Sequence, residues 1–307
     1  MRIAFIKNLI KKRKKNKNIF LVTGDLGYSV MEEFIDQFPS NYINAGVAEQ
    51  NMIGFVAGLA LDGNKVYVYS INNFIVFRAL EQIRNDICYH NLKVKIVTVG
   101  SGFAYGTAGY THYGIEDITI VRTLPNITIF CPADPIQLNY IFNEINNYKN
   151  SLYLRLGKGN EPNITTSDMK KKYLEKNYFE IFKLKKINII CFGSIAIEAY
   201  TACLYLKEKL NINIGLITIP KITKEKNIYL EKLIKKSSTI ITLEEHILTG
   251  GFGSYILETY YKSIIKTKFY KLGIEKRFNS IGDQEYMRKI NNIDSKGIIK
   301  FIKNKIL

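Results

Sequence analysis

Short apolar runs alternate along the chain with longer segments that have helical spacing. In the first half, apolar runs predict strands at 19–27, 65–70, 94–100, 126–134 and 151–157. Between them, apolar residues three and four apart predict helices at 46–62, 74–90 and 135–147. Repeated strand–helix–strand units indicate a parallel sheet that is covered by helices on both faces.

The same alternation resumes after a polar stretch at 158–178, which is the best candidate for a linker. Strands are predicted at 187–194, 212–220, 238–246 and 269–275. Helices are predicted at 195–210, near 227–236 and after the "GGFGS" segment at 250–254. The expected fold class is therefore α/β with two doubly wound domains, residues 1–178 including the linker and a smaller domain of residues 179–307.

Composition narrows the class of protein. The four cysteines are far apart and form no CxxC pair, which argues against a zinc site or a disulfide framework and fits a reducing cytoplasm. No secretory signal is recognisable, and no apolar run approaches the roughly 18 residues that a membrane span needs. We therefore expect a cytoplasmic protein without a membrane partner.

The formal charge of +17 raises the question of nucleic-acid binding. The basic residues are spread along the chain among many Ile and Asn residues, and the densest run, at 11–17, is expected to form a solvated face or a helix end. We expect no nucleic-acid partner, whereas an anionic substrate or an acidic protein would benefit from the same charge.

Candidate chemistry lies where the strands of the first domain end. Ligands of open α/β sheets bind beyond the carboxyl ends of the strands. Four stretches fall there: "TGDLGYS" (23–29), the segment around Glu49, the glycine-rich 100–114 and "LRLGKG" (154–159). The aromatic residues within 100–114 favour an ordered loop over a merely flexible connection. No GxGxxG fingerprint or Walker A sequence is complete.

Glu49 stands out because most faces of the predicted helix at 46–62 are apolar. A buried carboxylate is unfavourable unless it has a partner or takes up a proton. The simplest alternative is a carboxylate that the dipole favours at a helix N-terminus. The helix itself is either a core helix or part of an interface.

Four motifs now occur in the order and spacing of the pyrimidine-binding half of transketolase: "NAGVAEQNMIGFVAGLALDG", "NFIVFRALEQIRNDICYH", "GYTHYGIEDITIVRTLPNITIFCPAD" and "LYLRLGKG". The later "TLEEHILTGGFGS" resembles the transketolase C-terminal domain. The resemblance covers nearly the whole chain. It implies a thiamine-diphosphate-dependent transferase that moves a two-carbon ketol unit from a ketose, expected to be phosphorylated, to an aldose.

The resemblance also implies a cofactor site. Glu49 would hydrogen-bond N1′ of the aminopyrimidine and take part in the proton relay that activates the cofactor. Phe74 and Phe77, three apart on one helix face, would wall the pyrimidine pocket, although such a pair is more often part of a core. Asp25 matches a family aspartate near the cofactor, with an Asx-turn as its alternative role.

Substrate contacts are implied for three further residues. His112 matches the family histidine that faces the substrate oxygen, where imidazole donates to a developing alkoxide or moves a proton. Ser29 and Arg155 match positions that hold the sugar phosphate, and a surface salt bridge is the alternative for Arg155. His246 is expected to be structural or interfacial.

The sequence departs from the transketolase pattern in its substrate-reading residues and in its diphosphate motif. Ala108 and Gly100 stand where transketolases carry an acidic residue and a histidine that read substrate hydroxyls, which puts ordinary pentose-phosphate substrates in doubt. The GDG motif that binds the diphosphate through Mg²⁺ is missing. The chain thus resembles the C-terminal section of a split transketolase, with diphosphate and Mg²⁺ held by an N-terminal partner subunit and self-association across a twofold axis.

Other functions remain open at this point. The nearest are the β subunit of a 2-oxo acid dehydrogenase, which the "TH" of the loop disfavours, and an enzyme like deoxyxylulose-phosphate synthase. A non-catalytic scaffolding homologue is a different class, and the retention of Glu49 and His112 speaks against it.

Overall fold

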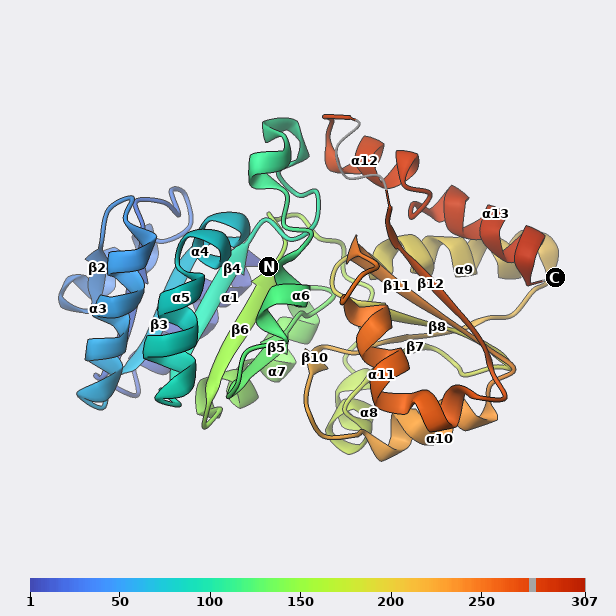
Figure 1. Ribbon diagram of the computed structural model, residues 1–307, viewed down its shortest axis with the longest axis horizontal. Coiled ribbons are helices and arrows are strands. Elements are labelled where there is room, and N and C mark those ends of the chain that lie inside the picture. Colours follow the sequence, from blue (N-terminus) through green and yellow to red (C-terminus); the bar gives the residue numbers. More distant parts are fainter. Residues whose placement is uncertain (276–279, 307) are drawn as a thin grey trace.

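The computed structural model describes residues 1–275 and 280–306, which form two α/β units side by side along the long axis of the molecule (Figure 1). The first sheet has the strand order β10-β5-β6-β4-β3-β1-β2. Its strands are β1 (Ile19–Thr23), β2 (Tyr42–Asn44), β3 (Lys65–Ile71), β4 (Val94–Val99), β5 (Ile127–Phe130), β6 (Ser151–Leu156) and β10 (Lys221–Ile222). All pair in parallel except β10, which runs antiparallel to β5.

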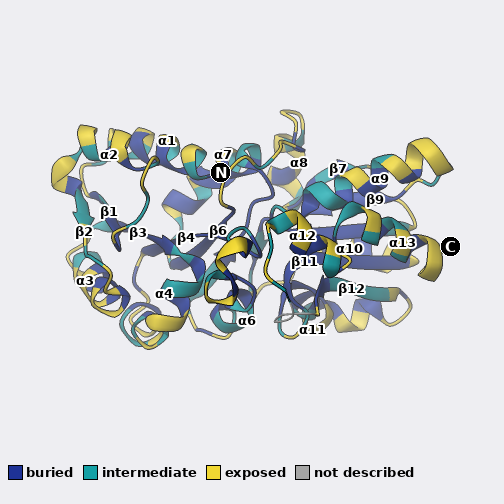
Figure 2. Ribbon diagram, turned by 90° about the horizontal axis from the view of Figure 1, so that it is seen from above, coloured by how far each residue is buried: buried dark blue, intermediate teal, exposed yellow. Residues whose placement is uncertain are grey.

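Helices cover both faces of this sheet, as the alternating pattern predicts (Figure 2). One face carries α1 (Arg2–Arg13), α2 (Glu32–Gln37) and α7 (Pro135–Asn147). The other carries α3 (Glu49–Leu61), α4 (Asn72–Arg78) and α6 (Asp117–Val121). The predicted helix at 74–90 is not continuous, because Ala79 leaves helical geometry with φ −117° and ψ 22°. It is divided into α4, α5 (Leu80–Gln82) and the π-helix η2 (Ile83–Tyr89).

The second sheet has the order β12-β11-β8-β9-β7. Its strands are β7 (Phe179–Phe182), β8 (Ile187–Phe192), β9 (Gly215–Thr218), β11 (Thr239–Ile247) and β12 (Lys268–Ile274), all parallel to their neighbours except β7. One face carries α9 (Ala196–Leu210) and α13 (Ser295–Lys305), the other α10 (Ile228–Lys236) and α11 (Phe252–Ile264), with α12 (Gln284–Ile290) beside the first unit (Figure 1). The α/β fold class with two doubly wound units is confirmed.

Several parts of the fold differ from the expectation. The strands β2 and β7 and the helices α2, α12 and α13 were not predicted. The polar stretch 158–178 contains α8 (Met169–Lys176), and its Tyr173 ring stacks on Phe179 with centroids 4.4 Å apart, so this stretch is more than a linker. Helix α1 was not predicted as a helix, and the basic run begins in its last turn. Strand β10 comes from the second half of the chain but completes the edge of the first sheet.

Helix α3 is buried on one side only. Met52, Ile53 and Val56 pack into the core, whereas Phe55 and Leu61 are exposed. The expectation that most faces of this helix are buried is therefore wrong for the single chain. The outward side of α3 therefore carries these two large apolar side chains together with Gln50 and Asn51.

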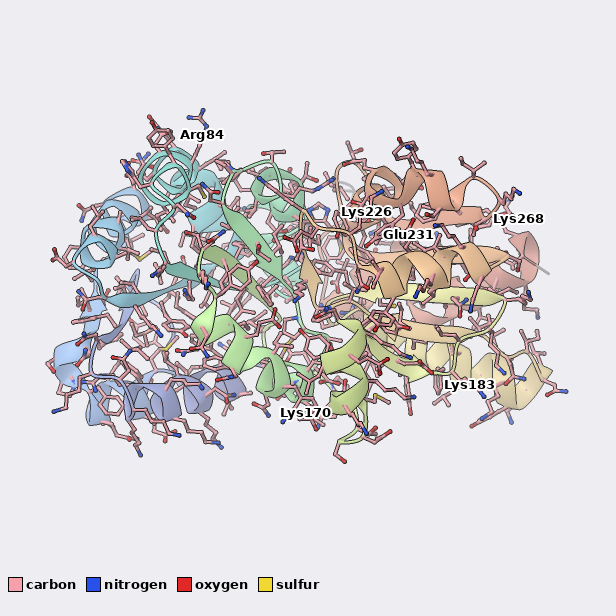
Figure 3. The ribbon with its side chains drawn as sticks, turned by 90° about the horizontal axis from the view of Figure 1, so that it is seen from below. Arg84, Lys170, Lys183, Lys226, Glu231 and Lys268 are labelled. Carbon is pink, nitrogen blue, oxygen red and sulfur yellow. The ribbon has the colours of Figure 1, made fainter. Side chains whose placement is uncertain are left out.

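The positions of the basic side chains agree with the expectation that they are spread over the surface. Figure 3 shows the labelled side chains Arg84, Lys170, Lys183, Lys226 and Lys268 pointing outward over both units rather than gathering in one place. No helix within the described residues is long and apolar enough to cross a membrane.

Candidate functional site

Glu49 is the first residue of α3, at the carboxyl-end edge of the first sheet. Its side chain is only 4% exposed, and its Oε1 accepts a hydrogen bond from Nη1 of Arg78 at 2.8 Å. The position at the helix N-terminus favours negative charge. An open cavity of about 610 Å³ lies in front of the carboxylate and is lined by Val47, Ala48, Glu49, Gln50, Asn51 and Arg78.

An unbroken line of contacts runs from Glu49 to His112. The guanidinium carbon of Arg78 lies 4.3 Å from the centroid of the Phe74 ring, a cation–π distance. The Phe74 ring meets the imidazole of His112 edge to face, with centroids 4.9 Å apart. The structure therefore brings together Glu49, Phe74 and His112, which lie far apart in the sequence.

Phe77 lies on the same short helix α4 as Phe74 but is 49% exposed. It makes no contact with another ring within the part of the chain that the structure describes. Its role as a wall of the pyrimidine pocket stays a prediction.

The glycine-rich loop at 100–114 is ordered, with two 3-10 turns, η3 (Gly106–Ala108) and η4 (Tyr110–His112). Asn73 Nδ2 donates to the carbonyl of Thr111 at 2.6 Å, and the Thr111 hydroxyl lies 3.0 Å from His112 Nδ1. These contacts hold the partly exposed imidazole, two residues before the loop ends at Gly114. One departure from the family also has a structural reason: a Cβ at Gly100 would lie 2.4 Å from the Tyr105 ring, so Tyr105 takes the space of a side chain there.

Asp25 and Ser29 lie in the exposed loop after β1. Asn44 Nδ2 donates to Asp25 Oδ1 at 3.0 Å, and the Asp25 backbone N–H donates to Asn44 Oδ1 at 2.9 Å. The Ser29 N–H donates to Glu32 Oε1 at 2.6 Å. Both residues have positive φ, 55° and 63°, so these local hydrogen bonds hold an unusual backbone conformation. Their cofactor and phosphate contacts stay predictions.

Arg155 is 2% exposed, which the alternative of a surface salt bridge did not anticipate. Its Nε donates to Asp117 Oδ2 at 2.8 Å, and its Nη2 donates to the carbonyls of Gly114 and Glu245 at 2.6 and 3.2 Å. Burial alone would raise the pKa of Asp117, but Arg155 and then His246 hold it below its ordinary value. The structure thus gives Arg155 an internal partner, and phosphate binding by Arg155 stays a prediction.

His246 bridges the two units, as expected for a structural or interfacial histidine. It is fully buried, its Nε2 accepts the Ile118 N–H at 3.1 Å, and its Nδ1 lies 2.8 Å from the Ile247 carbonyl. These partners suit a neutral ring that carries its proton on Nδ1. Burial lowers the pKa of His246 to about 4.

Sequence reasoning missed Arg78 and the adjacent glutamates Glu244 and Glu245. Arg78 follows Phe74 by four positions and so shares its helix face, which is a usable signal. Glu244 accepts the backbone N–H groups of Phe252 and Gly253 at the start of α11 at 2.5 and 2.8 Å. Burial raises the pKa of Glu244 to about 8, although these N–H groups oppose the shift.

Glu244→Gln is expected to flatten the pH dependence of stability. Between pH 4.5 and about 8 the native protein holds a proton on Glu244 that the unfolded chain has lost. Stability therefore falls as pH rises through this window, by at most about 1.4 kcal/mol per pH unit. Urea unfolding at several pH values measures the free energy of unfolding of both proteins.

The difference between the two curves isolates Glu244, because His246 is present in both proteins. Glu208→Gln, which alters an exposed carboxylate on α9, is the matched control and should follow the wild type. Parallel curves for Glu244→Gln and the wild type would show that the buried carboxyl does not titrate in this window.

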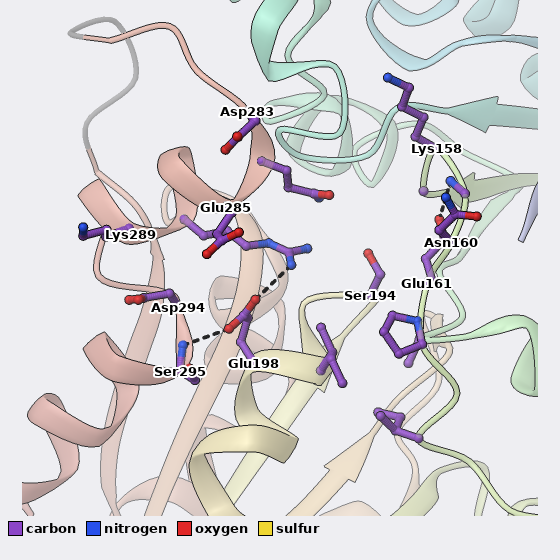
Figure 4. A pocket seen from close by; sticks show the side chains of 18 of the residues that line it. Lys158, Asn160, Glu161, Ser194, Glu198, Asp283, Glu285, Lys289, Asp294 and Ser295 are labelled. Atoms are coloured by element: carbon purple, nitrogen blue, oxygen red, sulfur yellow. Dashed lines mark hydrogen bonds and ion pairs between the residues drawn. The ribbon is translucent and has the colours of Figure 1, made fainter. Parts of the chain in front are cut away.

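A second cavity, of about 620 Å³, lies where the two units meet (Figure 4). The segments after β6 and β8 and the helices α9, α12 and α13 line it, with Lys158, Ser194, Glu198 and Asp294 among the labelled side chains. Within residues 1–275 and 280–306, no three His, Cys, Asp or Glu side chains gather into a possible metal site.

Comparison with known proteins identifies the two units. The model of the transketolase pyrimidine-binding domain matches residues 1–163, and the model of the transketolase C-terminal domain matches residues 183–298. The predicted domain boundary at residue 178 lies between these two matches.

Two curated relatives have lengths similar to that of this chain. The chain is 33% identical over 267 residues to one of the subunits of apulose-4-phosphate transketolase from Actinobacillus succinogenes, covering 87% of this chain and 85% of that protein. It is 35% identical over 266 residues to a putative transketolase C-terminal section from Methanocaldococcus jannaschii, covering 84% and 81%.

Two solved transketolase structures superpose on this chain. A split-gene transketolase, described as an inactive beta4 tetramer, superposes with a TM-score of 0.86 at 26% identity, covering 98% of this chain and 96% of that one. A transketolase from Campylobacter jejuni superposes with a TM-score of 0.79 at 18% identity, but this chain spans only 46% of its length, and the likeness concerns the fold alone. Because the pyrimidine-binding model by itself matches more than half of the 307 residues, the chain belongs to the transketolase family.

Proposed function

We propose that this chain is the pyrimidine- and substrate-binding subunit of a two-subunit, thiamine-diphosphate-dependent transketolase. The observation that carries the proposal is the line of contacts Glu49–Arg78–Phe74–His112, which joins three of the family motifs at the carboxyl ends of the first sheet's strands. Two relatives, one named as a transketolase subunit and the other as a C-terminal section, support the division of labour with a partner.

The residues at this edge fit the pyrimidine end of the cofactor. A buried carboxyl beside an open cavity, with an aromatic face close by, suits a flat ring that has a nitrogen able to share a proton. When bound, thiamine diphosphate supplies the electron sink that allows a carbon–carbon bond next to a carbonyl to be broken. We propose that Glu49 holds a proton at N1′, Phe74 and Phe77 contact the ring, and Asp25 lies near it. Mg²⁺ and the diphosphate belong to the partner subunit.

His112 is proposed to face the substrate oxygen. Its Nδ1 side is occupied by the Thr111 hydroxyl, which leaves Nε2 for a ligand. An imidazole N–H at that point stabilises an oxygen that gains negative charge in the transition state. His112 thereby lowers the barrier for cleavage of a ketose, while Ser29 is proposed to contact its phosphate.

The exposed apolar side of α3 is proposed to pack against a second copy of the chain. Phe55 and Leu61 are exposed on the helix that begins with Glu49, so an assembly that covers them also encloses the cofactor site. We also propose a cytoplasmic location, which the four free thiols support.

The test is reconstitution. The purified chain is mixed with its N-terminal partner subunit, thiamine diphosphate and Mg²⁺, and ketol transfer from a ketose phosphate to an aldose phosphate is followed by mass spectrometry of the products. Transfer by the mixture supports the proposal. Acetyl transfer to lipoamide, or condensation of pyruvate with an aldose, would instead identify the two alternative enzyme classes.

Arg78→Gln is expected to raise KM for a phosphorylated ketose about tenfold more than KM for its unphosphorylated analogue. Arg78 is 48% exposed at the site, and a charge-assisted hydrogen bond to an anion contributes roughly 1.5–3 kcal/mol. Arg78→Gln also removes the partner of Glu49, which should lower kcat for both donors alike, so the ratio of the two KM changes isolates phosphate binding. Steady-state kinetics of the reconstituted enzyme with both donors gives the two ratios.

Arg155→Gln tests Arg155, the other candidate for phosphate binding. Removing the Arg155 cation leaves Asp117 buried without its partner, so the variant should unfold about 3–5 kcal/mol more easily. If Arg155→Gln instead unfolds like the wild type and loses affinity only for the phosphorylated donor, Arg155 and not Arg78 is the phosphate ligand.

A further inference from the structure

A carboxylate from the second unit lies under the neck of the loop that carries His112. Glu245, near the end of β11, is buried, and its Oε1 accepts the backbone N–H of Phe103 at 2.9 Å. A Cβ at Gly102 would lie 2.5 Å from Cγ and Cδ of Glu245. The backbone therefore passes directly over this carboxylate, and glycine is needed there because φ is also +63°.

The neck is the base of the loop, where Gly102 and Gly114 are joined by two backbone hydrogen bonds. Gly102 N–H donates to the Gly114 carbonyl at 2.8 Å, and Gly114 N–H donates to the Gly102 carbonyl at 2.9 Å. Immediately beyond it, Ile247 N–H donates to the Ile115 carbonyl at 3.0 Å. Both sides of the neck are thus held by the end of β11. The Glu245 side chain holds the side at Phe103, and the Ile247 backbone holds the side at Ile115.

Glu245 is itself held in place by residues of α12. Arg288 donates to its Oε2 through Nε at 3.0 Å and through Nη2 at 2.6 Å, and Gln284 Nε2 donates to Oε1 at 2.9 Å. Charge-assisted hydrogen bonds are stronger than neutral ones, so Arg288 holds Oε2 firmly while Gln284 holds Oε1. The carboxylate that accepts from Phe103 is thus held at both oxygens.

Two packed rings connect this position to the segment that carries His112. Phe103, whose N–H Glu245 accepts, packs edge to face on Tyr113 with centroids 5.1 Å apart, and both rings are almost fully buried. Tyr113 directly follows His112. A shift of Phe103 would therefore move the backbone next to the imidazole.

We infer that Glu245 is a positioning residue for His112, so that the second unit sets the geometry of the catalytic site without touching the substrate. The inference rests on the proposed role of His112. It assigns a task in the reaction to a domain that supplies none of the proposed ligand contacts.

The test compares two replacements of Glu245 with a matched control. Glu245→Asp keeps the charge for Arg288 but withdraws the acceptor from Phe103, and Glu245→Ala removes both. Glu198→Gln is the control, because Glu198 accepts Arg288 Nη1 at 3.1 Å and, among the described residues, has no hydrogen bond or ion pair with the loop. If Glu245→Ala does not fold, Glu245→Asp gives the result.

The first measurement is NMR of the isolated chain with labelled histidine. The chain has three histidines, and His112→Asn identifies the signal of His112 by its loss. The His112 signal should move in both Glu245 variants and stay in place in Glu198→Gln. The second measurement is turnover with the partner subunit, where kcat should fall about 10- to 100-fold with KM changed less than twofold, because a small misplacement of a catalytic group is enough for such a loss.

An unmoved His112 signal in both Glu245 variants overturns the inference. Equal losses of kcat in Glu245→Asp and Glu198→Gln also overturn it, because they would reflect a weakened contact between the units. If the signal moves but the wild-type mixture transfers no ketol unit, control of the loop by Glu245 stands and the proposed function fails.

Discussion

Glu49→Gln is expected to reduce turnover of the reconstituted enzyme by about 100- to 10,000-fold, the range that positioned acid–base groups contribute. Glutamine keeps the shape of the side chain but cannot give or accept the proton at N1′. The buried setting of Glu49 at the start of α3 strengthens this dependence, because little water is available to replace the carboxyl. Hydrogen–deuterium exchange at C2 of the bound cofactor, followed by NMR, measures the affected step directly.

Glu81→Gln is the control for that experiment. It changes an exposed carboxylate on the neighbouring helix α5 and should leave exchange unaltered. Exchange in Glu49→Gln at more than half the wild-type rate, with cofactor bound, would remove Glu49 from the proposed mechanism.

The isolated chain is expected to bind neither thiamine diphosphate nor Mg²⁺ tightly and to catalyse no transfer. A diphosphate is strongly anionic and is held through a divalent cation with oxygen ligands. The chain lacks the GDG motif that provides them in the family, and its proposed contacts are with the pyrimidine and the substrate. Isothermal titration of both ligands into the chain should give no saturable heat.

Addition of the partner subunit should restore binding and activity together. The titration is therefore repeated with the mixture and with the partner alone, which separates a shared site from one that the partner completes by itself. Stoichiometric cofactor binding or ketol transfer by the isolated chain would contradict the split arrangement and require a metal–diphosphate site elsewhere in this sequence.

Alternation of apolar runs predicted most strands of both sheets, but not the edge strands β2, β7 and β10, nor how the two sheets are joined. Helix α1 was missed because its four buried residues, Phe5, Ile6, Leu9 and Ile10, stand among lysines that lower the apolar signal. Strand β10 has two residues, and its partner β5 ends about 90 positions earlier, so no local pattern reveals the pairing. Such contacts depend on tertiary packing rather than on local preference.

In the candidate site, too, the sequence predicted some features, whereas others depend on tertiary packing. Glu49, Phe74 and His112 were found by their motifs, and the structure brings them into one line of contacts. Arg155 is different, because its burial is produced by Asp117 and by the carbonyl of Glu245 from the other unit. A motif gives the identity of a side chain, whereas its access to a ligand depends on what packs over it.

The antiparallel pairing of β10 with β5 limits how this chain can be divided into smaller pieces. Cutting the chain just before β7 would remove β10 from the first unit and uncover the edge of β5 that β10 now occupies. An uncovered edge of a sheet is a template for pairing with other chains, so the fragment that contains β5 would tend to aggregate. A minimal pyrimidine-binding module must therefore carry residues 221–222 along with it, and a gene break between the two units would separate strands that belong to one sheet.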